Sequence, residues 1–147
     1  MRMADEVKAL FPGRHFGAPA TEADLCRAEV ALGEPLPPVL RELYLAFDGF
    51  RGPTDAAFLW PLFAPEGLVE MNQFYRDDDL FPQDLISRCV FFGDNGCGPQ
   101  WGIVRDRPDA VIEWDAGWGA EFRAAGATPL DAWRAAKRMY DSLDAEG

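Results

Sequence analysis

Residues 89–92 form a continuous apolar run, Cys-Val-Phe-Phe, and such a run leaves a chain few ways to fold. It suits a central β-strand that is covered on both of its faces. Residues 93–99, with three glycines, an asparagine and a proline, predict a turn-rich connection after it. Apolar residues at 101–104 and 110–114 then flank residues 106–109 (Asp-Arg-Pro-Asp), which predicts a β-hairpin with its turn at 106–109.

Two helices are predicted in the first third of the chain by their start and stop residues. Thr21 is a good N-cap with acidic residues in the turn after it, and Gly33 with Pro35 ends that helix. A second helix opens at residues 36–38 (Leu-Pro-Pro) and stops at residues 48–49 (Asp-Gly). Because the link is short, we expect the two helices to pack against each other as a helical hairpin.

Five further elements complete the prediction. Periodicity and composition indicate a short helix at residues 7–11, an edge-type strand at 58–63, a helix at 68–75 and a last strand near 120–124. A C-terminal helix begins after Thr128, which is an N-cap. Its buried stripe is expected to consist of Leu130, Trp133, Tyr140 and Leu143.

Glu29 is out of place on the apolar face of the first predicted hairpin helix, between Leu25 and Leu32. Burying a carboxylate without partners is costly. We therefore expect Glu29 to accept hydrogen bonds from nearby backbone N–H groups, in a structural role.

Composition predicts one acidic α+β domain and excludes several classes of function. The chain has 147 residues, 48% of them hydrophobic, which is enough for one core. Fourteen basic and 25 acidic residues give a formal charge of −11, which argues against nucleic acid or an anionic membrane as partner, since both bind clustered Lys and Arg. No segment reads as a signal peptide or a bilayer span, so we expect a cytoplasmic location.

Residue types that carry out common catalysis are scarce. His15 is the one histidine, and neither Ser87 nor Ser142 lies in a nucleophile elbow. The three cysteines include no Cys-x-x-Cys pair, which predicts reduced thiols rather than a zinc or redox site. Cys97 lies close to Asp94, whose charge disfavours a thiolate. We therefore predict no enzymatic activity, no metal and no cofactor.

Negative charge is concentrated in residues 50–84, which hold seven acidic and two basic side chains. Solubility is one explanation. The other is an acidic face that attracts a basic protein and raises the rate of association. Aromatic residues beside the acids are either interface anchors or part of the core. The partner-binding residues predicted on this basis are Glu66, Glu70, Phe74, Tyr75, Asp77, Asp78 and Asp79.

The order of these parts resembles the SUKH superfamily, also called the Smi/Knr-type family. Its N-terminal signature is matched by a helix with Glu29, a stop at Leu32-Gly33, a start at Leu36-Pro37 and a stop at Asp48-Gly49. Residues 92–98 and the strand after them look like the family's strand, Gly-rich loop and strand, and residues 130–133 are similar to its closing helix. Asp48 stands where the family commonly has Asn, and Asp can still cap locally.

This resemblance implies a single α+β domain over residues 1–147 with its core at about 20–143, in which helices pack around an antiparallel sheet. Bacterial members are typically immunity proteins that bind a cognate toxin, often a nuclease, and block it inside the producing cell. Fungal relatives regulate cell-wall synthesis and signalling through protein contacts. The resemblance therefore implies a protein partner, here a basic toxin, and no cofactor.

Two other functions remain open at this point. One is a regulatory scaffold that assembles host proteins without inhibiting a toxin. The other is an enzyme or small-molecule binder that uses the loop at residues 93–98 with Trp101, Trp114 and Trp118. Ligand contacts at that loop, or converging acids in a pocket, would favour the latter.

Overall fold

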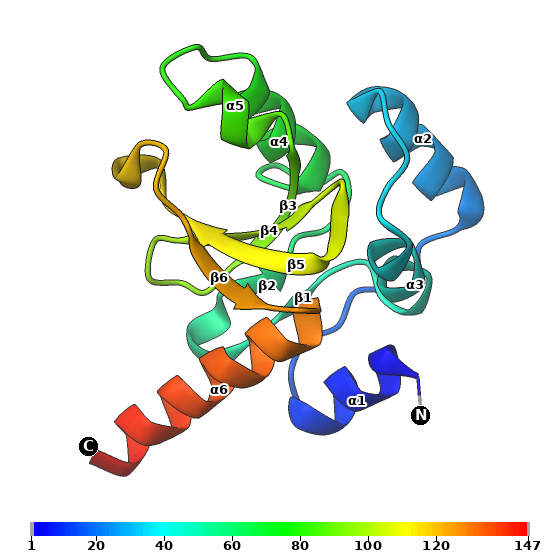
Figure 1. Ribbon diagram of the computed structural model, residues 1–147. Helices are drawn as coiled ribbons and strands as arrows, with labels where there is room; N and C mark the ends of the chain where they lie inside the picture. Colours follow the sequence, from blue (N-terminus) through cyan, green and yellow to red (C-terminus); the bar gives the residue numbers. More distant parts are fainter. Residues whose placement is uncertain (1, 147) are drawn as a thin grey trace.

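The computed structural model describes residues 2–146, so the first and last residues of the expected domain lie outside it. The helices are α1 (Met3–Leu10), α2 (Glu22–Leu32), α3 (Pro38–Ala46), α4 (Leu68–Arg76), α5 (Gln83–Ile86) and α6 (Pro129–Glu146). The strands are β1 (Phe50–Arg51), β2 (Ala57–Leu59), β3 (Cys89–Asp94), β4 (Gln100–Val104), β5 (Arg107–Trp114) and β6 (Arg123–Gly126). This arrangement confirms the α+β class with an N-terminal helical hairpin and a C-terminal helix (Figure 1).

The main sheet has four antiparallel strands in the order β3-β4-β5-β6. A two-stranded antiparallel ribbon, β1-β2, lies beside it. The backbone N–H of Trp60, just after β2, donates to the carbonyl of Phe92 in β3 at 2.7 Å and joins the two sheets. Gly93 allows the close approach, since a Cβ at that position would lie 1.9 Å from the carbonyl oxygen of Phe58.

The prediction of β3 as a central strand is wrong, because β3 is at the edge of the main sheet. Its side chains are nonetheless buried, as the apolar run indicated. The outer edge of β3 is covered by Trp60 and by the side chain of Asn72 in α4, which bonds to both the N–H and the carbonyl of Phe91. An apolar run indicates that a strand is buried. Here the outer edge of β3 is covered by the side chain of Asn72 and by Trp60 at the end of the β1-β2 ribbon, instead of by a fifth strand.

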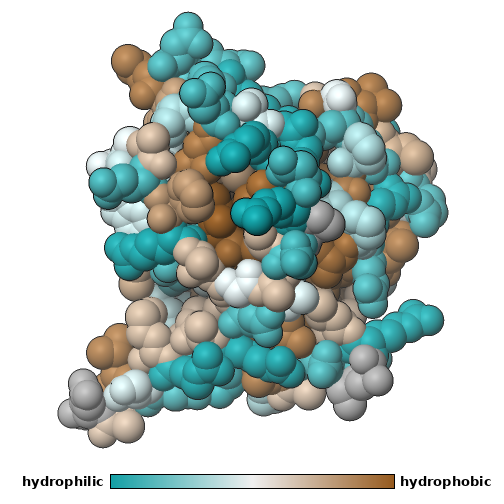
Figure 2. Space-filling model, viewed as in Figure 1, coloured by the Kyte–Doolittle hydropathy of each residue, from teal (hydrophilic) through white to brown (hydrophobic). Residues whose placement is uncertain are grey.

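The sheet lies between two helical layers. Trp133 of α6 is fully buried on one face, against Phe92, and Figure 1 shows α1 and α6 side by side below the sheet. Tyr75 of α4 packs on the other face, against Phe91 and Trp114. Figure 2 shows hydrophilic residues spread over the outside in this view, with hydrophobic residues visible between them.

Several strand boundaries differ from the prediction. Val104 already pairs with Arg107, so the β4–β5 turn lies at residues 105–106 and β5 begins earlier than expected. β2 ends at Leu59, before Pro61, which has no N–H to donate. β6 begins at Arg123 rather than at residue 120, because a 3-10 turn at Ala116–Trp118 lengthens the connection.

Helix boundaries follow their caps. Thr21 and Asp24 form a capping box at the start of α2, and Gly33 ends that helix with a φ of 76°. Thr128 and Asp131 bond reciprocally at the start of α6. The predicted stripe of α6 is wrong at Leu143, which is 55% exposed, because the end of α6 projects beyond the sheet (Figure 1).

The expected role of Glu29 is confirmed. Its Oε2 accepts the backbone N–H of Leu36 at 2.6 Å, and its Oε1 accepts Arg41 Nη1 at 2.7 Å. Arg41 also reaches Glu22 at 2.5 Å. The carboxylate of Glu29 thus fixes the link between α2 and α3, which explains an acid at an inward-facing helix position.

Candidate functional site

Helix α4 has one buried and one exposed side. Leu68, Val69, Asn72 and Tyr75 are buried, and they recur at intervals of three and four. Glu70, Phe74 and Asp77 recur at the same spacing on the other side and are exposed. The helical period therefore separates a core stripe from a solvent stripe within residues 50–84, the part of the chain with the largest acidic excess.

The exposed stripe continues into the loops at both ends of the helix. We call the set Glu66, Glu70, Phe74, Asp77 and Asp79 the α4 surface; all five side chains are exposed. Its four carboxylates take part in no ion pair within residues 2–146. Arg76, the nearest cation in sequence, turns inward to Glu34 instead. The negative charge of the α4 surface is therefore uncompensated by close cations in this part of the chain.

Two apolar side chains accompany these acids. Phe74 is 53% exposed, and its ring is held edge-on against Tyr75 at 5.4 Å between centroids. Leu80 is 91% exposed directly after the acidic loop. Sequence reasoning missed Leu80; its place next to three aspartates, outside any apolar period, was the available signal. Exposed apolar side chains inside a charged rim are typical of protein interfaces.

Hollows lie at both ends of the α4 surface. At its start, a hollow of about 500 Å³ is lined by Glu66 and Met71 together with Trp60 and Asp94. At its end, one of about 780 Å³ includes Asp79 and Phe122. Such concavities beside exposed acidic and apolar side chains can receive partner side chains.

A comparison with protein families matches residues 19–142 to the SMI1 / KNR4 family (SUKH-1). The chain belongs to this family. The match covers most of the sequence and agrees with the resemblance expected over residues 20–143. Membership in SUKH-1 supports a role in protein interaction. A comparison with curated proteins finds no match.

The N-terminal residues that carry the SUKH-1 signature maintain the fold through contacts outside the α4 surface. Glu29 closes the α2–α3 link, as described above. Asp48 Oδ1 accepts the backbone N–H of Leu62 at 2.8 Å, so Asp at this position still caps a turn. Gly49, next to it, has a φ of 89° and would place a Cβ 2.9 Å from the nitrogen of Pro61. The signature therefore identifies the family without identifying a binding site.

Two of the predicted contact residues of this SUKH-1 chain are not free surface groups. Tyr75 is 4% exposed, and its hydroxyl interacts with Gln100 Nε2 at 2.5 Å. Burial, with smaller contributions from Asp115 and Asp94, raises the pKa of Tyr75 to about 12. Asp78 is half-buried, and its Oδ1 accepts the N–H of Leu80 at 2.9 Å. Both residues support the α4 surface from below; neither forms it.

The three tryptophans do not converge on the Gly-rich loop; of these residues, Asn95 and Trp101 line one hollow, and Trp114 and Trp118 lie outside it. Trp114 is fully buried on the α4 side of the sheet, and Trp101 is 2% exposed among residues that face α6. Trp118 is half-buried under the guanidinium of Arg123 at 4.3 Å. Within residues 2–146 no group of three His, Cys, Asp or Glu residues is placed to hold a metal ion. In the same range no helix is both long and apolar enough to cross a membrane.

The three thiols of the SUKH-1 chain differ in access, which predicts their reactivity. Burial raises the pKa of Cys89 from 9.0 to about 11, although nearby arginines oppose the shift. Cys26 and Cys97 are exposed. At pH 8 we expect two thiols to react within minutes with an aromatic disulfide reagent, and Cys89 to react only after unfolding. Fast reaction of all three thiols in the folded protein would contradict this expectation. Fast reaction of Cys89 in the folded Cys26→Ser/Cys97→Ser variant would contradict it as well.

Proposed function

We propose that this chain is an immunity protein that binds a cognate bacterial toxin in the cytoplasm of the producing cell. It neutralises the toxin by masking its active surface and performs no reaction of its own, without metal or cofactor. The partner is a basic toxin, such as a nuclease. The observation that carries the proposal is the α4 surface, with four exposed carboxylates and Phe74 along α4 and its flanking loops.

Electrostatics supports this kind of partner. A nuclease grips phosphate with clustered Lys and Arg, so its active surface is positive. An acidic surface is attracted to such a positive surface and accelerates the encounter, and this effect weakens as salt screens it. Phe74 and Leu80 then supply the desolvated contacts that hold a complex together. Family membership in SUKH-1 supports the protein-binding part of the proposal.

Co-expression with the toxin encoded beside the gene tests the function directly. We expect growth to be rescued by the chain and abolished by the toxin alone. A pull-down that returns several housekeeping proteins, with no rescue of growth, would replace the proposal with the regulatory scaffold.

Charge reversal on the α4 surface tests the site. We expect Glu70→Lys/Asp77→Lys to weaken toxin binding at least about tenfold and to flatten its salt dependence, since close interfacial charges couple strongly. Binding is measured by surface plasmon resonance at 50 and 300 mM salt. Asp5→Lys/Asp144→Lys, which reverses two exposed acids in α1 and α6, is the matched control. Equal losses in both double variants would show that net charge, and not this surface, controls binding.

A further inference from the structure

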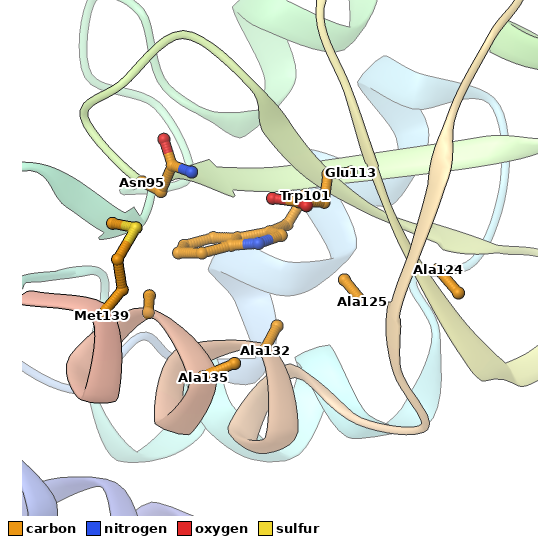
Figure 3. A pocket seen from close by; sticks show the side chains of 9 residues that line it. Asn95, Trp101, Glu113, Ala124, Ala125, Ala132, Ala135 and Met139 are labelled. Atoms are coloured by element: carbon orange, nitrogen blue, oxygen red, sulfur yellow. The ribbon is translucent and has the colours of Figure 1, made fainter.

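A second concavity lies on the face of the sheet opposite α4. It is enclosed by α6 on one side and by β4, β5 and β6 on the other, and its volume is about 270 Å³ (Figure 3). We call it the α6 slot. It is lined by Asn95, Trp101, Glu113, Ala124, Ala125, Ala132, Ala135, Ala136 and Met139. The small side chains of β6 and α6 leave the space, and the indole of Trp101 forms its floor.

The α6 slot carries one acidic group, Glu113. It is half-buried and pairs across the strands with Trp101, so both side chains lie on the same face of the sheet. Its other neighbour in the ladder, Arg123, is placed over the ring of Trp118 at 4.3 Å. Within residues 2–146 the carboxylate of Glu113 forms neither an ion pair nor a hydrogen bond. An acid that lies next to an apolar cavity and forms no ion pair has its charge available to a ligand.

Asn95 supplies the second polar group, and its orientation follows from its contacts. The residue is 9% exposed. Its Oδ1 accepts the backbone N–H of Cys97 at 2.8 Å, and its carbonyl accepts the hydroxyl of Tyr140 at 2.6 Å. The side-chain amide nitrogen therefore has no partner within the described chain, and Asn95 stands at the rim of the slot in Figure 3. This nitrogen is not one of the buried polar atoms that lack a partner, so solvent reaches it and its two N–H groups can donate to a ligand at the rim of the slot.

We propose that the α6 slot binds the side chain of a lysine or arginine residue of a protein partner. The cation meets the carboxylate of Glu113, and the aliphatic stem lies along the alanines of α6. The face of Trp101 adds a cation–π contribution. A main-chain carbonyl of the same partner residue accepts the amide of Asn95.

Size and chemistry select this occupant. Sites for whole small molecules usually measure about 300–1,000 Å³, whereas a cavity of about 150 Å³ already holds benzene, so the slot suits a single long side chain. A free diamine satisfies Glu113, yet it carries no acceptor for Asn95. A peptide residue supplies both the cation and the acceptor. The inference stands on the α6 slot alone, on the far side of the sheet from the α4 surface, and does not require a toxin partner.

Nuclear magnetic resonance of the full chain tests the proposal with defined probes. The indole N–H of Trp101 and the amide of Asn95 are followed during titration with the N-acetyl methylamides of lysine, arginine and norleucine, and with putrescine. We expect saturable shifts at both groups with lysine or arginine, and binding at least about tenfold weaker with norleucine or putrescine. Equal binding of norleucine would overturn the role of the cation, and equal binding of putrescine would overturn the peptide source.

Variants locate the interaction. Glu113→Gln is expected to weaken binding of the basic probe about tenfold, because it removes a charge-assisted hydrogen bond from a partly buried site. Glu121→Gln, an exposed acid outside the slot, is the control and leaves binding unchanged. Ala135→Leu fills the slot from an exposed helix position and abolishes binding without touching the core. Unchanged binding in both Glu113→Gln and Ala135→Leu would overturn the proposal.

Discussion

Replacing Asn72 by leucine is expected to lower the free energy of unfolding by about 3–5 kcal/mol, since buried polar groups left unpaired cost about 1–3 kcal/mol each. Asn72 is 1% exposed. Its amide donates to the carbonyls of Leu68 and Phe91 at 2.8 Å, and its Oδ1 accepts the N–H of Phe91 at 2.9 Å. Leucine fits the space but strands the N–H and carbonyl of Phe91 in an apolar interior.

Urea denaturation followed by tryptophan fluorescence measures this effect. Gln73→Leu is the matched control, because the exposed amide of Gln73 makes one bond, to the carbonyl of Ala31 at 3.1 Å. We expect the control to lose less than about 1 kcal/mol. A loss for Asn72→Leu as small as the control's would show that water or a backbone shift replaces the missing bonds.

A second large effect is expected at Glu34. The carboxylate contacts Arg76 and lies 2.7 Å from Nε of Arg105, while its own side chain is 10% exposed. Arg76, which is 19% exposed, also donates to the carbonyl of Cys89 at 3.1 Å. Glu34→Leu leaves that guanidinium without a counter-ion, and breaking a buried pair on one side costs about 3–5 kcal/mol. The pair that joins the residues after α2 to Arg105 in the β4–β5 turn is lost with it.

Two companion variants distinguish charge burial from simple loss of contact. Arg105→Gln is expected to cost about 1 kcal/mol or less, because Arg105 is 40% exposed and surface pairs contribute little. Glu34→Leu/Arg76→Met removes both buried charges and is expected to recover part of the loss. Denaturation curves for the three variants provide the comparison. A double variant that is less stable than Glu34→Leu alone would contradict the charge argument.

Helix boundaries could be predicted from the sequence because the signals are local. Thr21 and Gly33 are caps whose effect extends over one turn of helix. Thr21 begins α2 and Gly33 ends it, both where expected. Glu29 was also predictable, since an acid on an apolar face requires partners that a nearby helix start can supply. Strand order depends on contacts between distant residues, so the run at residues 89–92 indicated burial without indicating an edge.

The α4 surface was predictable in outline and not in detail. Acidic residues between 66 and 79 marked the segment, but charge alone does not tell Phe74 from Tyr75. The helical period does: Phe74 shares a side with Glu70, and Tyr75 with Asn72. The α6 slot was beyond sequence reasoning, because Asn95, Glu113 and Met139 meet only after the sheet and α6 have packed.

The covering of the β3 edge by Asn72 and Trp60 has a consequence for self-association of the protein. An unpaired strand edge is a template for other chains, and β3 begins with the apolar run at residues 89–92. The side chain of Asn72 and the backbone N–H of Trp60 form hydrogen bonds to the edge of β3, so these groups are not free to pair with another chain. The opposite edge, β6, is short and carries the cationic Arg123, both of which discourage intermolecular pairing. Local detachment of α4 would therefore uncover the N–H and the carbonyl of Phe91 and make that edge available for pairing with another chain.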